Sequence, residues 1–309
     1  MRSAAATSSA SPLEQRLAAT LKAVAQHAAD PPGSLVPAAP THPALERIGR
    51  RAEAGFREIV ALLSFVGEVA VAFARSVPRP ASQLHPLRWR PVLFNIRSAG
   101  FDALPIVGLL SFLLGIVVAY QGAAQLRQYG ANIFVADLVG LSMLREFAPL
   151  ITAIIVAGRS GSAYAAQIGT MAVTEEIDAM RTLGIAPLDL LVLPKVIALV
   201  IALPLLTVFA DVLGVFGGMI MARAQLGVGY GEFLDRFVKA VSITAYLIGI
   251  CKAPVFAAII AVVGCFQGFR AKGGADSVGR QTTRSVVHAI FLVIVADALF
   301  SVAFSALDL

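Results

Sequence analysis

The sequence predicts an all-α integral membrane protein with an N-terminal amphipathic helix at the membrane interface and about five transmembrane helices. Of its 309 residues, 58% are hydrophobic and 14% are charged, and the mean hydropathy is +0.80. Soluble domains carry about 25% charged residues. Apolar runs long enough to cross a bilayer recur along the chain. Both observations favour a protein with several membrane spans over a soluble globular one.

The N-terminal part predicts two segments ahead of the spans. Residues 1–44 are rich in alanine, proline and serine, so we expect a weakly ordered leader with a short helix around 13–26. This leader lacks the basic start and apolar core of a cleavable signal peptide. Residues 45–85 predict an amphipathic interfacial helix followed by a proline-rich connection, because apolar residues recur at helical spacing between arginines. Its most apolar part, 59–74, is shorter than the about 20 residues of a span and contains Glu68.

Residues 86–309 hold the apolar runs and are predicted to form the membrane domain. The expected spans are 102–126, 135–157, 190–221, 243–266 and 285–307. Pro204 and Pro254 fall inside two of them and predict kinks. Two GxxxG pairs, at 214–218 and 264–268, predict close helix packing within the subunit or across a dimer.

The distribution of lysine and arginine predicts the orientation of these spans. Ten basic residues fall in the connections on one side of the membrane and four on the other. Because basic residues are enriched in cytoplasmic loops, the N-terminus is expected in the cytoplasm and the C-terminus outside. The ten are Arg88, Arg90, Arg97, Arg159, Arg181, Lys195, Arg270, Lys272, Arg280 and Arg284, and the four are Arg127, Arg223, Arg236 and Lys239.

The stretch 158–187 predicts a short cytoplasmic helix between the second and third spans. Thr174 is the expected N-cap, Glu175 and Glu176 lie in the first turn, Arg181 lies in the last turn, and Gly184 follows the end. The small residues that precede it predict close approach of helices.

One face of this short helix is predicted to be apolar, because Ile177, Met180 and Leu183 recur every three positions. Asp178 joins the glutamates and Arg181 on the polar side. So short a helix needs a surface to pack on. From the spacing alone, a helix that docks on a partner and an ordinary solvated loop helix are equally favoured.

Charged residues inside the spans are the best indication of a functional site. Arg145 and Glu146 lie about 15 Å into the second span, where ionised side chains are costly and face a cavity or a partner. Two roles are open for Arg145 and Glu146: a substrate site or a structural ion pair. Asp211, Lys252 and Asp297 are single charges in the later spans, for which a mutual lysine–aspartate contact is favoured. His288 is expected to pack and form hydrogen bonds.

Several function classes find no support in the sequence. No Walker A motif is present, so the chain itself is not expected to bind ATP. There is no nucleophile with a base, no metal-ligand cluster and no basic, aromatic-rich stretch for nucleic acid. An ion-coupled transporter or channel that uses the intramembrane charges stays open as an alternative, although the inverted repeats frequent in such folds are not found. A scaffold without transport would leave Arg145 and Glu146 without a transport role.

Several runs of sequence resemble the MlaE/YrbE family of ABC-transporter permeases over about residues 90–309. They are LREFAPL, GRSGSAYAAQIGTM, VTEEIDAMRTLGI, LPKVIALVIALPLLTVFADVLGVFGG and QTTRSVVHA, in this order. The resemblance implies the membrane subunit of an ATP-driven phospholipid transporter that maintains outer-membrane lipid asymmetry.

The same resemblance implies the setting and the site residues. The expected assembly is a homodimer in the bacterial inner membrane with two ABC ATPase subunits, which hold ATP and Mg, and an MCE-domain hexamer. No cofactor is expected in this chain. Arg145 and Glu146 would lie near a lipid cavity at the dimer centre. The short cytoplasmic helix, with Glu175, Glu176, Asp178 and Arg181, would contact the ATPase.

Overall fold

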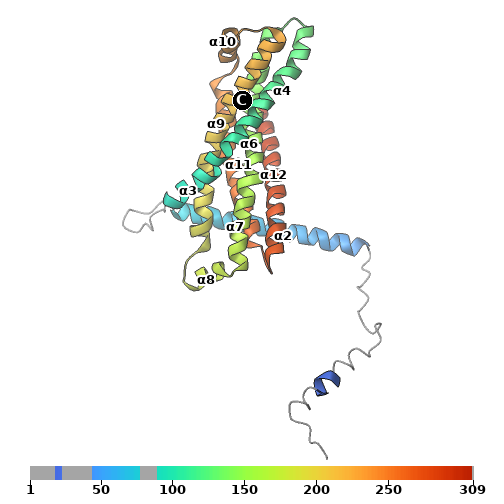
Figure 1. Ribbon diagram of the computed structural model, residues 1–309, viewed down its shortest axis with the longest axis vertical. Coiled ribbons are helices and arrows are strands. Elements are labelled where there is room, and N and C mark those ends of the chain that lie inside the picture. The colour runs from blue at the N-terminus through green and yellow to red at the C-terminus, as the bar shows by residue number, and fades with distance from the viewer. Residues whose placement is uncertain (1–17, 23–43, 77–88, 308–309) are drawn as a thin grey trace, which may run out of the picture. The chain divides into compact units, whose positions relative to one another are not determined.

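The computed structural model describes residues 18–22, 44–76 and 89–307, and every regular element in these ranges is helical (Figure 1). This confirms the all-α prediction for the described residues. The chain divides into two compact units, Met1–Ile59 and Val60–Leu309. In the first unit, residues 18–22 are helical, within the helix expected at 13–26. Residues 1–17 and 23–43 of the leader lie outside the described residues, as does the connection at 77–88.

From α3 onward the helices follow one another with short connections. The first long helix, α2, covers Ala44–Ser76 and so matches the predicted amphipathic helix. The later α-helices are α3 (Trp89–Ala99), α4 (Leu104–Gln128), α5 (Val135–Ser142), α6 (Ala148–Val156), α7 (Ser162–Val173), α8 (Glu176–Thr182), α9 (Leu193–Leu226), α10 (Tyr230–Ala240), α11 (Ile243–Phe269) and α12 (Ala275–Ala306). The remaining elements are the 3₁₀ turns η1 (Phe101–Ala103) and η2 (Asn132–Phe134), and the π turns η3 (Met143–Phe147), η4 (Ala157–Gly161) and η5 (Leu188–Val192).

Five stretches of the described chain are long and apolar enough to cross a membrane, as predicted. They are Arg90–Gln128, Asn132–Val173, Leu188–Leu226, Ile243–Phe269 and Ala275–Ala306. The second is far longer than the predicted 135–157, because helix continues through the glycine- and serine-rich residues 158–173. Those residues therefore belong to the span rather than to a connection. Pro204 and Pro254 both lie inside continuous helices.

Glycines bring the long helices into backbone contact inside the subunit. A side chain at Gly115 of α4 would collide with the carbonyl oxygen of Gly214 in α9. A Cβ at Gly264 of α11 would lie 2.8 Å from the carbonyl oxygen of Gly161 in η4. Both GxxxG pairs predicted from the sequence thus pack within the subunit, where small residues allow helix backbones to approach closely.

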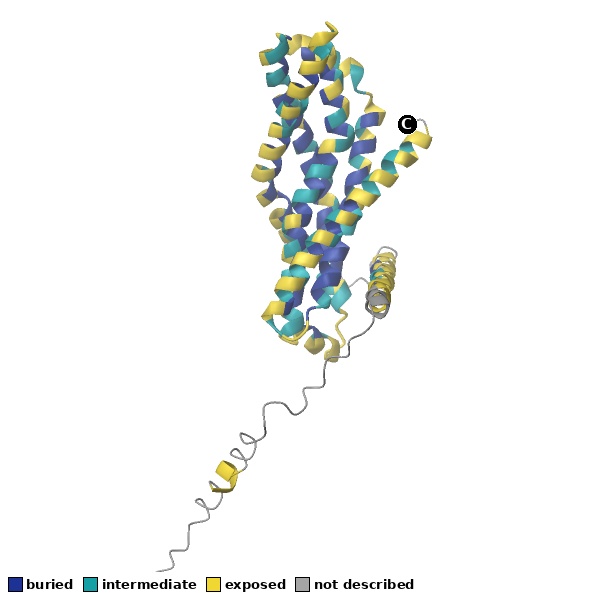
Figure 2. Ribbon diagram, turned by 90° about the vertical axis from the view of Figure 1, so that its right-hand side faces the viewer, coloured by how far each residue is buried: buried dark blue, intermediate teal, exposed yellow. Residues whose placement is uncertain are grey.

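Figure 2 shows buried residues along the middle of the bundle, whereas α12, which ends at the label C, is largely exposed.

The C-terminal part of α2 packs on the same unit through one aromatic side chain. Phe65 is buried, and its ring lies 5.6 Å from that of Phe266 and 5.8 Å from that of Phe269, measured between centroids. Val69, one turn later, is buried as well. The other side of this turn carries exposed apolar residues such as Leu63 and Val66. Apolar residues on both sides of a helix that also carries Glu68 fit the predicted place at a membrane interface.

The short helix α8 differs from its prediction at the N-terminus. Thr174 was expected to cap it, but the Thr174 hydroxyl donates to the carbonyl of Thr170, 3.0 Å away, and so extends the end of α7. The residue before α8 is Glu175, whose φ of 60° is left-handed. A threonine hydroxyl bonds a carbonyl one turn back as readily as it caps, and here the preceding helix uses it.

The apolar face predicted for α8 is only partly packed. Ile177 is buried and Met180 is half-buried, whereas Leu183 is 76% exposed. The predicted C-terminal glycine is confirmed, since Gly184 has a φ of 74° and its N–H donates to the carbonyl of Arg181. The helix is therefore fixed at both ends and leaves Leu183 and its polar side uncovered within the described chain.

Candidate functional site

The two charged residues of the second span lie in a π turn. Arg145 and Glu146 belong to η3, where the N–H of Ala148 donates to the carbonyl of Met143, five positions earlier. The sequence explains the location, because Pro149 has no N–H to offer the carbonyl of Arg145 and its ring would clash with that carbonyl in a regular α-helix. Such turns widen a helix locally and are frequent at functional sites.

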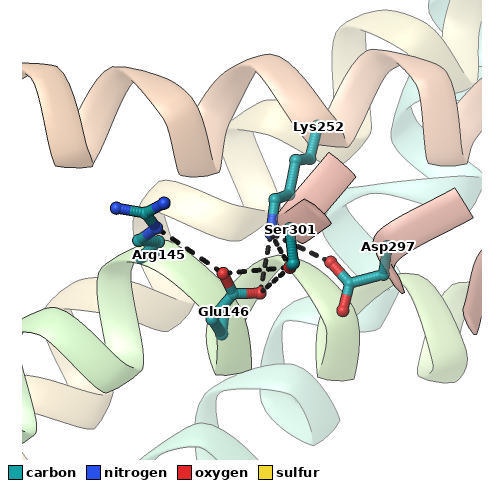
Figure 3. A network of polar contacts seen from close by, with 5 residues as sticks. All are labelled: Arg145, Glu146, Lys252, Asp297 and Ser301. Atoms are coloured by element: carbon teal, nitrogen blue, oxygen red, sulfur yellow. Dashed lines mark hydrogen bonds and ion pairs between the residues drawn. The ribbon is translucent and has the colours of Figure 1, made fainter. Parts of the chain in front are cut away.

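Glu146 is joined to two other spans by direct polar contacts (Figure 3). The Lys252 ammonium of α11 donates to Glu146 Oε2 at 2.7 Å and to Asp297 Oδ1 of α12 at 3.0 Å. The Ser301 hydroxyl, one turn after Asp297, donates to the Glu146 carboxylate at 3.2 Å. On the other side, Arg145 Nε lies 3.7 Å from Glu146 Oε1. We call these five residues the span network.

The span network has a buried side and an accessible side. The Lys252 side chain is fully buried and Asp297 is mostly buried, whereas Arg145 and Glu146 are 29% and 33% exposed. Two cations and two carboxylates balance, so the cluster is compatible with an apolar environment in which an uncompensated charge would cost several kcal/mol. The accessible edge offers a guanidinium and a carboxylate oxygen, which can bind a phosphate and an amine respectively.

The sequence predicted part of this arrangement. The contact between Lys252 and Asp297 is confirmed. The two interpretations of Arg145 and Glu146, as a site and as a structural pair, are not exclusive in the structure, because Glu146 is at once half-accessible and bonded to a buried lysine. Ser301 was missed. Its only signal is its spacing of four from Asp297, which places both on one face of α12.

Asp211 stands apart from the span network. It lies in α9, is only 4% exposed, and neither carboxylate oxygen has a hydrogen-bond partner among the described residues. It was predicted to be a single intramembrane charge, and no lysine of the described chain forms an ion pair with it. His288 meets its expectation, since its Nδ1 lies 2.9 Å from Gln267 Nε2 of α11.

The polar residues predicted on α8 lie at the end of the bundle opposite α10 (Figure 1). Glu175, Glu176, Asp178 and Arg181 are all exposed. Arg181 donates to Asp178 at 3.0 Å across one turn of the helix. An exposed pair of this kind adds little to stability, so these side chains are available to a partner.

Comparison with known proteins agrees with this architecture. The family model described as Permease MlaE matches residues 92–303. A probable ABC transporter permease protein of Rickettsia typhi is 34% identical over 246 residues, which cover 80% of this chain and 92% of the relative. The intermembrane phospholipid transport system permease protein MlaE of Haemophilus influenzae is 30% identical over 249 residues, covering 77% of this chain and 95% of the relative.

A plant protein is similar over the same region. The chloroplastic protein TRIGALACTOSYLDIACYLGLYCEROL 1 of Arabidopsis thaliana is 34% identical over 215 residues, which cover 70% of this chain and 61% of the relative. Together with five apolar spans and the matched residues 92–303, these similarities identify the family. The chain belongs to the MlaE family of ABC-transporter permeases, the non-catalytic membrane components that work with a separate ATPase subunit.

Proposed function

We propose that this permease moves phospholipid through the membrane and that Arg145 and Glu146 contact the lipid headgroup. The observation that carries the proposal is the span network: a half-exposed arginine and glutamate are supported by a fully buried lysine in the middle of membrane-spanning helices. Charged groups at this depth are costly and mark substrate paths. The Haemophilus relative is named as a phospholipid transport permease, and this name supports the choice of substrate.

The chemistry of a phospholipid headgroup matches the accessible edge of the network. A phosphate diester carries one negative charge, for which the planar Arg145 guanidinium is a bidentate donor. An amine on the headgroup would find a carboxylate oxygen of Glu146. The buried Lys252 holds this carboxylate at 2.7 Å and so fixes its orientation. The site thus binds a headgroup while its own charges stay balanced.

The ATPase contact is proposed to be α8. Its exposed acidic residues Glu175, Glu176 and Asp178, with Arg181 and the uncovered Leu183, form a short ridge that a groove with basic and apolar lining would accept. Because α8 follows the second span after one turn, movement of α8 is passed to the helix that carries Glu146.

The remaining parts of the assembly are proposed on the family resemblance. The permease acts as a homodimer in the bacterial inner membrane, with two ATPase subunits on the side of α8 and an MCE-domain hexamer on the side of α10. Residues 86–309 form the permease domain, 45–85 the interfacial helix with its connection, and 1–44 the leader. The predicted ten-to-four distribution of basic residues supports a cytoplasmic N-terminus and α8, and an outer C-terminus, although Arg159 and Lys195, both counted among the ten, lie within membrane-spanning helices.

The lipid site is tested by Glu146→Ala in the permease purified with its ATPase and reconstituted in liposomes. We expect ATP-driven transfer of labelled phospholipid to be lost while the complex still assembles. Wild-type transfer by Glu146→Ala would remove this residue from the site, and loss of assembly would assign it a structural role. Transfer that does not require ATP and is driven by an imposed ion gradient would instead support the ion-coupled alternative.

The orientation has its own test. A reporter enzyme that is active only outside the cytoplasm, fused after Leu309, should be active, and the same reporter inserted after Ile185 should be inactive. A cytoplasmic C-terminus would mean that a span has been missed or counted in excess.

A further inference from the structure

The helix α10 at the far end of the bundle has three distinct sides. One side packs on the bundle through Phe233, which is fully buried, and Phe237, whose ring stacks with it at 6.5 Å. A second side is apolar and exposed, with Leu234 and Val238 four positions apart. A third side carries the exposed charges Glu232, Asp235 and Lys239.

The orientation of α10 is fixed by a strong contact with α5. The Arg236 guanidinium donates through Nε and Nη2 to the two oxygens of Asp137, at 2.7 and 2.5 Å, and lies 4.5 Å from the centroid of the Phe134 ring. The hydrogen bond to Asp137 raises the pKa of Arg236, so its guanidinium stays charged. With Arg236 and Phe233 held in place, the apolar side cannot turn toward the protein.

The apolar side is well exposed within the described chain. Val238 is 73% exposed and Leu234 is 46% exposed. At about 100° of rotation per residue, this side lies between the packed side and the charged side of the helix. A helix with protein on one side, apolar residues on the next and charges on the third has the form of a helix lying in the plane of a membrane surface.

The membrane span that follows α10 also carries an exposed apolar stripe. Ile243 begins α11 three residues after α10 ends, and it is followed on the same face by Leu247, Cys251 and Val255, all exposed and spaced four apart. The stripe runs down a helix that is long and apolar enough to cross the bilayer. The exposed apolar side of α10 is therefore followed closely in the chain by an exposed apolar stripe on a helix that can cross the bilayer.

We propose that Leu234 and Val238 insert into the lipid leaflet opposite α8, so that α10 is an in-plane anchor at the boundary of headgroups and acyl chains. The occupant of this surface is lipid. Both signs of charge are present on the outward side, so attachment comes from apolar insertion and does not need anionic lipid. Through Asp137, which precedes η3 on the same span, this anchor holds the outer end of the helix that carries Glu146.

The test measures the depth of single tryptophans in the full chain, reconstituted in phosphatidylcholine nanodiscs. The sequence contains one tryptophan, Trp89, so Trp89→Phe gives a background without tryptophan emission. Val238→Trp reports the apolar side, and Asp235→Trp, three positions away, is the matched control on the charged side. Nitroxide lipids quench from within the leaflet and iodide quenches from water.

We expect Val238→Trp to emit at shorter wavelength than Asp235→Trp, to be quenched several-fold more by nitroxide lipids, and to be protected from iodide. Equal iodide quenching at both positions would overturn the proposal. Protection from both quenchers would also overturn it, because protein rather than lipid would then cover the surface. If Val238→Trp fails to give a monodisperse protein, Leu234→Trp provides the same comparison.

Discussion

Lys252 Nζ lies 2.7 Å from Glu146 Oε2 and 3.0 Å from Asp297 Oδ1, and its side chain is fully buried. One lysine therefore neutralises two carboxylates from two other helices. A buried charge whose partner is removed costs about 3–5 kcal/mol, whereas removing both members together costs far less. The three residues should consequently behave as one unit in mutational experiments.

Lys252→Met is expected to lower the stability of the permease more than any other single change in the span network. It leaves Asp297 and Glu146 facing each other without the shared cation. We expect a loss of about 3 kcal/mol, measured by denaturant or thermal unfolding in detergent.

The double variant Lys252→Met with Asp297→Asn is the control for this prediction. It keeps Glu146 beside Arg145 and should recover part of the lost stability. Strictly additive losses would show that the contacts do not stabilise one another and would contradict the account of the network.

Asp211→Asn should leave stability unchanged or raise it. Asp211 is 4% exposed and neither carboxylate oxygen has a described partner, so the isosteric amide removes a buried ionisable group without removing a contact. Unfolding midpoints of the purified permease provide the measurement, with Asp297→Asn as the matched change that does break an ion pair. A comparable loss in both variants would mean that Asp211 has a partner in the assembly.

Gly115→Ala should destabilise the pair of helices α4 and α9. The added methyl group would meet the carbonyl oxygen of Gly214, which is backbone and cannot move aside, and overpacking of this kind costs about 1–3 kcal/mol. Gly279→Ala in α12 is the control, because open space surrounds that position and alanine favours helix by up to about 1 kcal/mol. Equal stability of the two variants would be inconsistent with the packing of α4 on α9.

Glu175→Lys combined with Asp178→Lys should release the ATPase while the permease stays folded and dimeric. Single changes such as Glu176→Ala are expected to be mild, since exposed charge pairs contribute little. Reversing two charges places like charges against the partner and should weaken binding by at least about tenfold, or about 1.4 kcal/mol. Co-purification of the tagged ATPase measures this, and wild-type stoichiometry together with normal transport would exclude docking through α8.

The sequence was most informative where the membrane imposes a rule. A span must be a long apolar run, so all five could be found, and a lysine among apolar residues must find a partner, so Lys252 and Asp297 could be paired. It was least informative where helix continues through residues that usually end it. Residues 158–173 are rich in glycine and serine, and this composition taken alone predicts a connection between helices. In the structure these residues are helical, and Gly161 packs against α11.

Two further features were beyond pattern analysis. The π turn at Arg145 is one of two ways in which a helix can accommodate the missing N–H of Pro149. The other way is a regular helix with a kink, and the sequence alone does not distinguish the two. The partner of Glu146 lies 106 positions away, and spacing along the chain carries no information on such a distance. The role of Thr174 was wrong because two helices compete for one hydroxyl.

The π turn η3 also determines how this segment can vary in length. A π turn is equivalent to one residue inserted into an α-helix. Deleting one residue from Met143–Phe147 would restore an α-helical turn and rotate one half of the span by about 100° relative to the other, with a shift of about 1.5 Å. Glu146 would then point away from Lys252. The ring of Pro149 would also clash with the carbonyl one turn earlier, to which proline has no N–H to donate. This stretch should therefore tolerate exchange of its apolar residues but neither an insertion nor a deletion.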